Sequence, residues 1–98
     1  MITARVDVEK GRIEVSGHSE YAPKGEDIVC AAVSALVCTL ASVTGDGDMA
    51  DGYIDWRVDG DVNGFAALWF VAAGLEKISE QYPNYIDFNI NSPTFADR

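Results

Sequence analysis

The sequence has few basic residues for its length. Only 7 of its 98 residues are Lys or Arg, against 16 Asp or Glu, so the formal net charge is −9. An acidic surface repels phosphate and anionic lipid, and we therefore expect neither nucleic acid nor a membrane surface as a partner. High net charge also favours solubility, so the charge by itself identifies no partner.

Long apolar runs and a secretory leader are also lacking. The longest apolar run, residues 28–43, is interrupted by Ser34, Thr39 and Ser42 and is shorter than the roughly 20 residues that a membrane span needs. The first residues have no cationic start, apolar stretch and cleavage site. We therefore expect a cytoplasmic protein.

Metal-binding patterns are missing as well. Cys30 and Cys38 are about 12 Å apart along a helix, too far for a disulfide, which needs Cα atoms within about 7 Å, so both thiols should be reduced. With a single histidine they match no usual zinc spacing. Residues 59–64 resemble the start of a calcium loop, but Phe70 stands where the required glutamate would be. We expect no metal and no cofactor.

The remaining pattern predicts one domain over residues 1–98, since 48% of the residues are hydrophobic. Periodicity and turn residues predict strands over 2–9, 12–16, 53–58 and 85–90, helices over 28–43 and 65–82, a loop over 44–52 and a frayed tail over 91–98. The order β-β-α-β-α-β favours an α+β fold, a two-layer structure with one mixed sheet and two helices on one face. Residues 66–74 carry enough apolar surface for either a homodimer contact or ordinary core packing.

One cysteine and the single histidine form a candidate site. His18 follows Gly17 at the end of the second strand, and Cys30 is the third residue of the helix that Asp27 begins. Unpaired amides and the dipole at a helix N-terminus favour a thiolate, and a nearby imidazole would form an ion pair with it. The loop 19–26 is long enough to fold back and bring the two together. A Cys-His dyad is the minimal catalytic hypothesis.

Structural roles compete with this hypothesis. His18 can be a surface residue and Cys30 a small buried hydrophobe, and Cys38, two turns into the helix, has a structural role. Ser34, one turn beyond Cys30, either lines a site or bonds back to the Cys30 carbonyl. Asp27 can cap the helix, orient an imidazole, or do both.

Residues 17–36, GHSEYAPKGEDIVCAAVSAL, resemble the signature of the ribosomal-processing cysteine protease family, called Prp. The glycine-histidine pair, the Tyr-Ala pair, the loop glycine and the run DIVCAAVS are kept without a gap. Gly74-Leu75 and residues 80–83 resemble the second helix of that family. Ser19 departs from the pattern, since alanine is common there.

The resemblance implies a homodimeric α/β cysteine endopeptidase that removes an N-terminal extension from the twenty-seventh large-subunit ribosomal protein; related proteins process phage head proteins. By position, Cys30 would be the nucleophile, His18 its base, and Gly17, Asp27 and Ser34 the other signature residues around the site. Residues 19–26 would be a mobile loop that closes over substrate. Amides at the helix N-terminus would stabilise the oxyanion, and an apolar groove would bind aromatic substrate residues. A non-catalytic assembly module of the same fold is the alternative.

Overall fold

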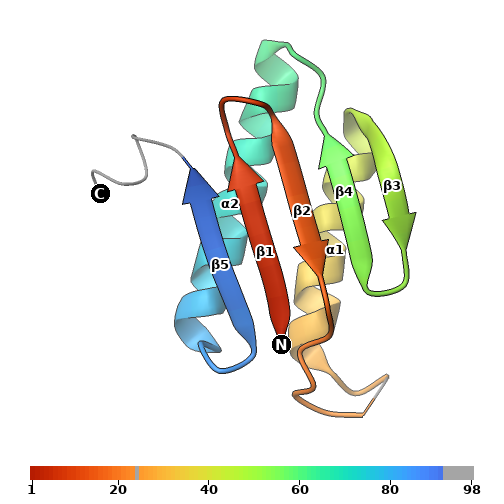
Figure 1. Cartoon of the computed structure of the whole chain (residues 1–98), viewed down its shortest axis with the longest axis vertical. Helices are drawn as coiled ribbons and strands as arrows, with labels where there is room; N and C mark the ends of the chain where they lie inside the picture. Colours follow the sequence, from red (N-terminus) through yellow and green to blue (C-terminus); the bar gives the residue numbers. More distant parts are fainter. Residues whose placement is uncertain (24, 92–98) are drawn as a thin grey trace.

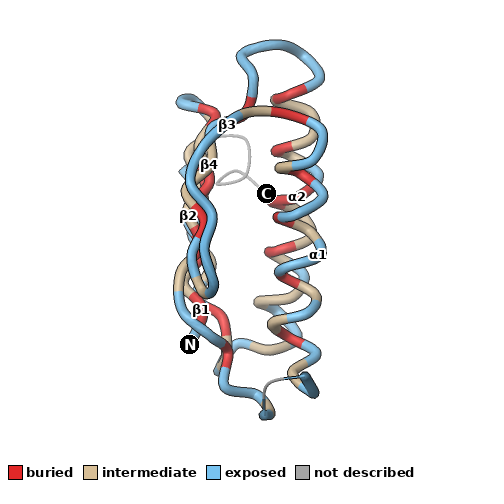
Figure 2. The backbone as a smooth tube through the Cα atoms, turned by 90° about the vertical axis from the view of Figure 1, so that its right-hand side faces the viewer, coloured by how far each residue is buried: buried red, intermediate tan, exposed pale blue. Residues whose placement is uncertain are grey.

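The structure, a computed structural model, describes residues 1–23 and 25–91. Its elements are β1 (Ile2–Asp7), β2 (Arg12–Ser16), α1 (Ile28–Val43), β3 (Asp46–Ala50), β4 (Tyr53–Arg57), α2 (Val62–Gln81) and β5 (Ile86–Asn91). The strands form one mixed sheet with both helices on the same face, in two layers (Figures 1 and 2). The predicted α+β class is therefore confirmed. Beyond Asn91, the tail expected to fray lies outside the described residues.

The sheet is built around the N-terminal hairpin. Its strand order is β3-β4-β2-β1-β5, so β1 and β2 are central and β3 and β5 are the edges (Figure 1). β1 pairs antiparallel with β2 and parallel with β5. Helix α2 joins β4 to β5 and so crosses the two central strands on the helical face. The period-two burial of β1, with Ile2, Ala4 and Val6 buried, places one face of the sheet against the helices.

The structure corrects the predicted loop over residues 44–52. Residues Asp46–Ala50 form β3, which pairs antiparallel with β4 from Asp46↔Arg57 to Ala50↔Tyr53. Every residue of β3 is exposed, so it carries no alternating hydrophobic pattern. Gly47 also approaches β4 closely, since a Cβ there would lie 2.1 Å from the Asp55 carbonyl oxygen. Pairing with β4 therefore gives residues 46–50 their strand conformation, and the local sequence pattern does not.

Helix α1 lies behind β2 and β4 (Figure 1). Asp27 caps it, and its buried residues Val29, Val33, Val37 and Leu40 repeat at helical spacing along one side of the helix. α2 covers an adjacent side, where Leu36 of α1 packs close to Gly74. A Cβ on Gly74 would lie 2.9 Å from a Leu36 methyl group, so the absence of a side chain there allows the helices to pack closely.

Helix α2 begins three residues before the predicted start at Phe65. Asp61 caps it, because its side chain accepts a hydrogen bond from the Gly64 amide at 2.7 Å. Asp61 belongs to the calcium-like pattern of residues 59–64, and its cap role explains why an acidic residue stands there. One side of this helix is buried, with Leu68, Val71 and Leu75 in the core.

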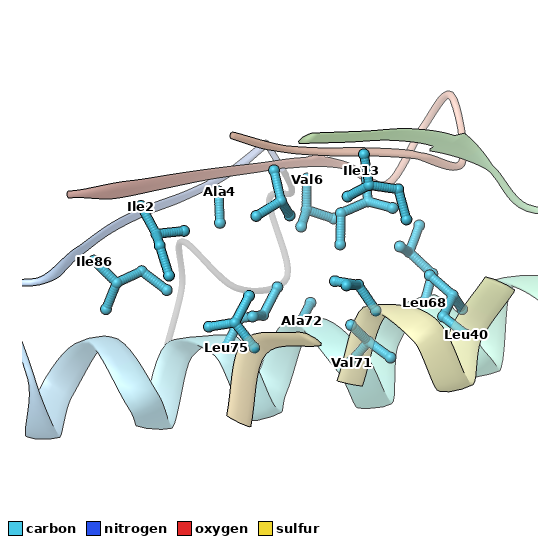
Figure 3. Packing of buried hydrophobic residues seen from close by; sticks show 14 of the residues in the cluster. Ile2, Ala4, Val6, Ile13, Leu40, Leu68, Val71, Ala72, Leu75 and Ile86 are labelled. Atoms are coloured by element: carbon cyan, nitrogen blue, oxygen red, sulfur yellow. The ribbon is translucent and has the colours of Figure 1, made fainter. Parts of the chain in front are cut away.

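The core is a single apolar layer between sheet and helices. Figure 3 shows sheet residues facing helix residues across it, and the largest fully buried side chains are Ile13, Leu40, Leu68, Leu75 and Val29. Burying each such side chain contributes about 1.5–3 kcal/mol. Within the described part of the chain, no helix is both long and apolar enough to cross a membrane.

Candidate active site

The segment from Gly17 to Asp27 leads from β2 to α1 at one end of the sheet (Figure 1). Gly17 has a φ of +90°, and a Cβ there would lie 2.5 Å from the carbonyl oxygen of Met1. Only glycine fits this position. Its amide donates to the carbonyl oxygen of Gly52 at 2.9 Å, which ties the segment to the turn between β3 and β4.

His18 is exposed and lies against that turn. A Cβ on Gly52 would be 2.7 Å from the imidazole Nε2, so the missing side chain makes room for the ring. Among the described residues, the ring makes no hydrogen bond to Cys30 or Asp27. Sequence reasoning missed Gly52, because Asp51-Gly52 signals a turn and does not indicate which side chain packs on it.

Asp27 joins the start of α1 to the preceding loop. One carboxylate oxygen accepts from the Cys30 amide at 2.9 Å; the other accepts from the Tyr21 amide at 3.1 Å and from the Ser19 hydroxyl. Partial burial opposes the charged form, but the hydrogen bonds from Cys30, Ser19, Ala22 and Tyr21 outweigh it and lower the pKa of Asp27 to about 2. Asp27 therefore acts as a helix cap and is a carboxylate at neutral pH.

The Cys30 sulfur is held by Ser19. Cys30 is half-buried, and its Sγ lies 3.4 Å from both the amide nitrogen and the hydroxyl oxygen of Ser19. Ser19 is 2% exposed, although it belongs to a loop. The sequence singled Ser19 out only as a departure from a pattern, because its contacts depend on how the loop folds back.

A pocket of about 660 Å³ brings together all five candidate residues, Gly17, His18, Asp27, Cys30 and Ser34. Its opposite wall is the β3–β4 hairpin, from Met49 to Ile54. Val33 and Val37 of α1 line it too, so part of its surface is apolar. Cys38, expected to have a structural role, is exposed and lines the same pocket.

Tyr53 lines the pocket, but its hydroxyl proton is committed to a neighbouring carboxylate. Burial, together with the nearby Asp55 carboxylate, raises the pKa of Tyr53, so its hydroxyl stays protonated at neutral pH. This hydroxyl donates to Asp55 at 3.4 Å. Arg12 also binds Asp55 through two hydrogen bonds of 2.8 and 2.7 Å and lowers the pKa of that carboxyl.

The family model described as Cysteine protease Prp matches residues 1–87 of the chain. The chain belongs to this family of cysteine proteases. No curated protein matches it. The family assignment agrees with the resemblance of residues 17–36.

Solved structures show the same fold. The Prp ribosomal processing protease of Staphylococcus aureus, with a covalently linked product peptide, superposes with a TM-score of 0.83 at 24% identity, covering 93% of this chain and all of that one. The same protease with a substrate peptide gives 0.78 at 23% identity and the same coverage. A Streptococcus mutans structure gives 0.68 at 23% identity, covering 91% of this chain and 90% of that one.

A Prp-family cysteine protease requires a reactive thiol, and this chain has two candidates. Cys30 and Cys38 are both free and both line the pocket. Only Cys30 lies in the first turn of α1, where the helix dipole favours negative charge. The two cysteines therefore form a matched pair for testing the site.

Proposed function

We propose that Cys30 is the nucleophile of the protease and that His18 is its general base. The observation that carries the proposal is that the single histidine of the chain and a helix N-terminal cysteine line one pocket. Hydrogen bonds between catalytic groups are often long or absent without substrate. A rotation of the exposed imidazole and a movement of the 17–27 segment would bring His18 to the sulfur.

The reaction then follows two steps. His18 takes the proton of the Cys30 thiol as the sulfur attacks the peptide carbonyl carbon, and the tetrahedral intermediate expels the amine, which takes that proton from the imidazole. A thioester to Cys30 remains. His18 next takes a proton from water, the hydroxide attacks the thioester, and the proton returns to the sulfur as the acid product leaves.

The oxyanion requires donors other than the Cys30 amide. That amide already donates to Asp27 at 2.9 Å. The amides of Ile28 and Val29 in the same turn donate to no other described residue. These two groups are therefore the helix N-terminal donors that remain for a developing negative charge.

The proposed substrate is the N-terminal extension of the twenty-seventh large-subunit ribosomal protein, cleaved in the cytoplasm during ribosome maturation. Two supports are the Staphylococcus aureus structures, described as those of a ribosomal processing protease and holding peptides. A third is the apolar part of the pocket, where Val33, Val37 and Met49 can accept an aromatic side chain. The two free thiols fit a reducing compartment.

Cleavage of defined peptides tests this substrate. We expect the purified protein to cut a peptide that spans the ribosomal extension at one bond, and to leave a scrambled peptide of the same composition intact; mass spectrometry of the products gives the bond. A peptide from a phage head protein is the competing substrate. Cleavage of the phage peptide alone would transfer the assignment to capsid processing, and cleavage of neither would favour a non-catalytic assembly module.

We further propose that two copies of the chain associate through α2. Val62 and Phe70 are 84% and 78% exposed, and Ala66 and Ala73 continue their stripe at helical spacing. A phenylalanine this exposed is costly in water, and a second copy would cover it with the same surface.

Sedimentation tests the dimer. We expect Phe70→Lys to weaken association about 100-fold or more, because the change removes a buried phenylalanine from each copy and introduces two charges. The variant should then sediment as the 10.6 kDa chain. Val43→Lys, at a side chain 70% exposed on α1, is the control and should leave the dimer intact. A wild-type chain that sediments as a monomer at high concentration contradicts the proposal.

A further inference from the structure

Ser19 occupies an unusual position for a loop residue. It is 2% exposed, and its hydroxyl lies between the Asp27 carboxylate and the Cys30 sulfur. Buried hydroxyls of this kind are usually fully bonded, and the direction of their single proton determines what they can accept. That direction can be deduced here.

The Ser19 hydroxyl donates its proton to the Asp27 carboxylate. A carboxylate has only acceptors, so Ser19 must be the donor in that close contact. The hydroxyl oxygen also accepts from the Tyr21 amide at 3.4 Å, and the charge on Asp27 makes the bond to the carboxylate the strongest of the three contacts of the hydroxyl. The hydroxyl oxygen therefore presents lone pairs to the Cys30 sulfur at 3.4 Å.

This arrangement distinguishes the two forms of the sulfur. A thiol can donate its proton to the Ser19 oxygen, whereas a thiolate meets lone pairs that repel it. The Ser19 amide, also 3.4 Å from the sulfur, donates to either form but more strongly to the thiolate. Asp27 binds the Cys30 amide directly, and the Ser19 hydroxyl is the group that links its carboxylate to the Cys30 sulfur.

We propose that Ser19 is a positioning residue that relays the charge of Asp27 to Cys30 and holds the sulfur as a thiol until substrate binds. The inference rests on the proposed role of Cys30 as nucleophile. Rearrangement of the 17–27 segment would break the relay and leave the thiol proton to His18. In the structure Ser19 is bonded to the sulfur and His18 is not, which is the arrangement that the relay requires before substrate binds.

Other titratable groups line the same pocket. His18 and Glu20 come from the segment after β2, Asp51 and Tyr53 from the β3–β4 hairpin, and Asp27 from the helix cap. None of the first four makes a hydrogen bond to the sulfur among the described residues. Among the described residues, only Asp27 is linked to the sulfur by hydrogen bonds, through the Ser19 hydroxyl, so a change at Ser19 isolates this link.

The test is the rate of Cys30 alkylation by iodoacetamide as a function of pH, read by mass spectrometry with Cys38 as reference in the same molecule. In Ser19→Ala we expect the rate curve of Cys30 to move to lower pH, with about three- to tenfold faster alkylation near pH 7, the effect of losing one hydrogen bond. Ser19→Thr keeps the hydroxyl and should restore the wild-type curve. Ser42→Ala, a serine on α1 that bonds only to its own helix, is the control.

An unchanged or slower Cys30 rate in Ser19→Ala would overturn the relay. If that variant does not fold, Asp27→Asn removes the charge but keeps a capping side chain, and it should also accelerate Cys30 alkylation; an unchanged rate there would again overturn the proposal. Alkylation needs no substrate turnover. The relay and the protease assignment can therefore fail separately: an unchanged alkylation rate would refute the relay, whereas the protease assignment is tested by peptide cleavage.

Discussion

Replacing Cys30 with alanine should lower peptide cleavage by about a thousandfold or more. The variant lacks the sulfur that attacks the carbonyl, and no thioester can form. Cys38→Ala should cleave at close to the wild-type rate, although Cys38 lines the same pocket, because it lies two turns into α1 and away from the helix N-terminus. The two variants remove the same atom from the same helix and differ only in position.

Single-turnover cleavage with enzyme in excess measures this difference directly. Peptide binding, followed by fluorescence anisotropy, should change little in Cys30→Ala, so the loss would be in chemistry. An acyl intermediate on Cys30 should be visible by mass spectrometry in the wild type only. Cleavage by Cys30→Ala at the wild-type rate would refute the mechanism, and a selective loss in Cys38→Ala would move the nucleophile to the second thiol.

Replacing His18 with alanine should lower cleavage by about 10²–10⁴-fold, the usual contribution of a general acid-base group. The imidazole is exposed and makes no hydrogen bond to Cys30 or Asp27 in the described structure, so its removal should leave the melting temperature nearly unchanged. The loss would then reflect proton transfer. It could not be attributed to unfolding.

Added imidazole provides the positive control for this variant. The pocket is open at His18, so free imidazole can enter and should restore part of the cleavage by His18→Ala in a concentration-dependent way. It should have no effect on Cys30→Ala. Full activity of His18→Ala without imidazole would show that another base serves the thiol, and the acidic groups of the pocket wall would be the next candidates.

Local sequence was sufficient for most elements of the fold. The alternation in residues 2–9 and 12–16 predicts the hairpin, because one face of these strands is buried and the other is not. Asp27 predicts the start of α1, because the first amides of a helix have no acceptor within the helix and a carboxylate can accept their hydrogen bonds. The two proposed catalytic residues, Cys30 and His18, were predicted from a characteristic run of the sequence, and the structure places both in one pocket.

Prediction failed where an element carries no hydrophobic pattern. β3 has no buried side chain, and its backbone is ordered by hydrogen bonds to β4 and by a close approach that Gly47 permits. The early start of α2 at Val62 follows from the cap made by Asp61, a polar residue outside the apolar pattern of the helix. Exposed strands and polar caps both lack the hydrophobic period on which sequence reading depends.

By itself, the sequence singled out Cys30 and His18 as candidates for the chemistry and determined which faces of the strands and helices are apolar, because those properties belong to single residues and their spacing. Only the tertiary structure decided which groups meet. It placed Gly52 under the imidazole of His18, and it put the hydroxyl of Ser19 between Asp27 and the Cys30 sulfur. Such contacts join residues from different segments, and they arise when the sheet and α1 pack and bring the loop and the hairpin to one end of the molecule.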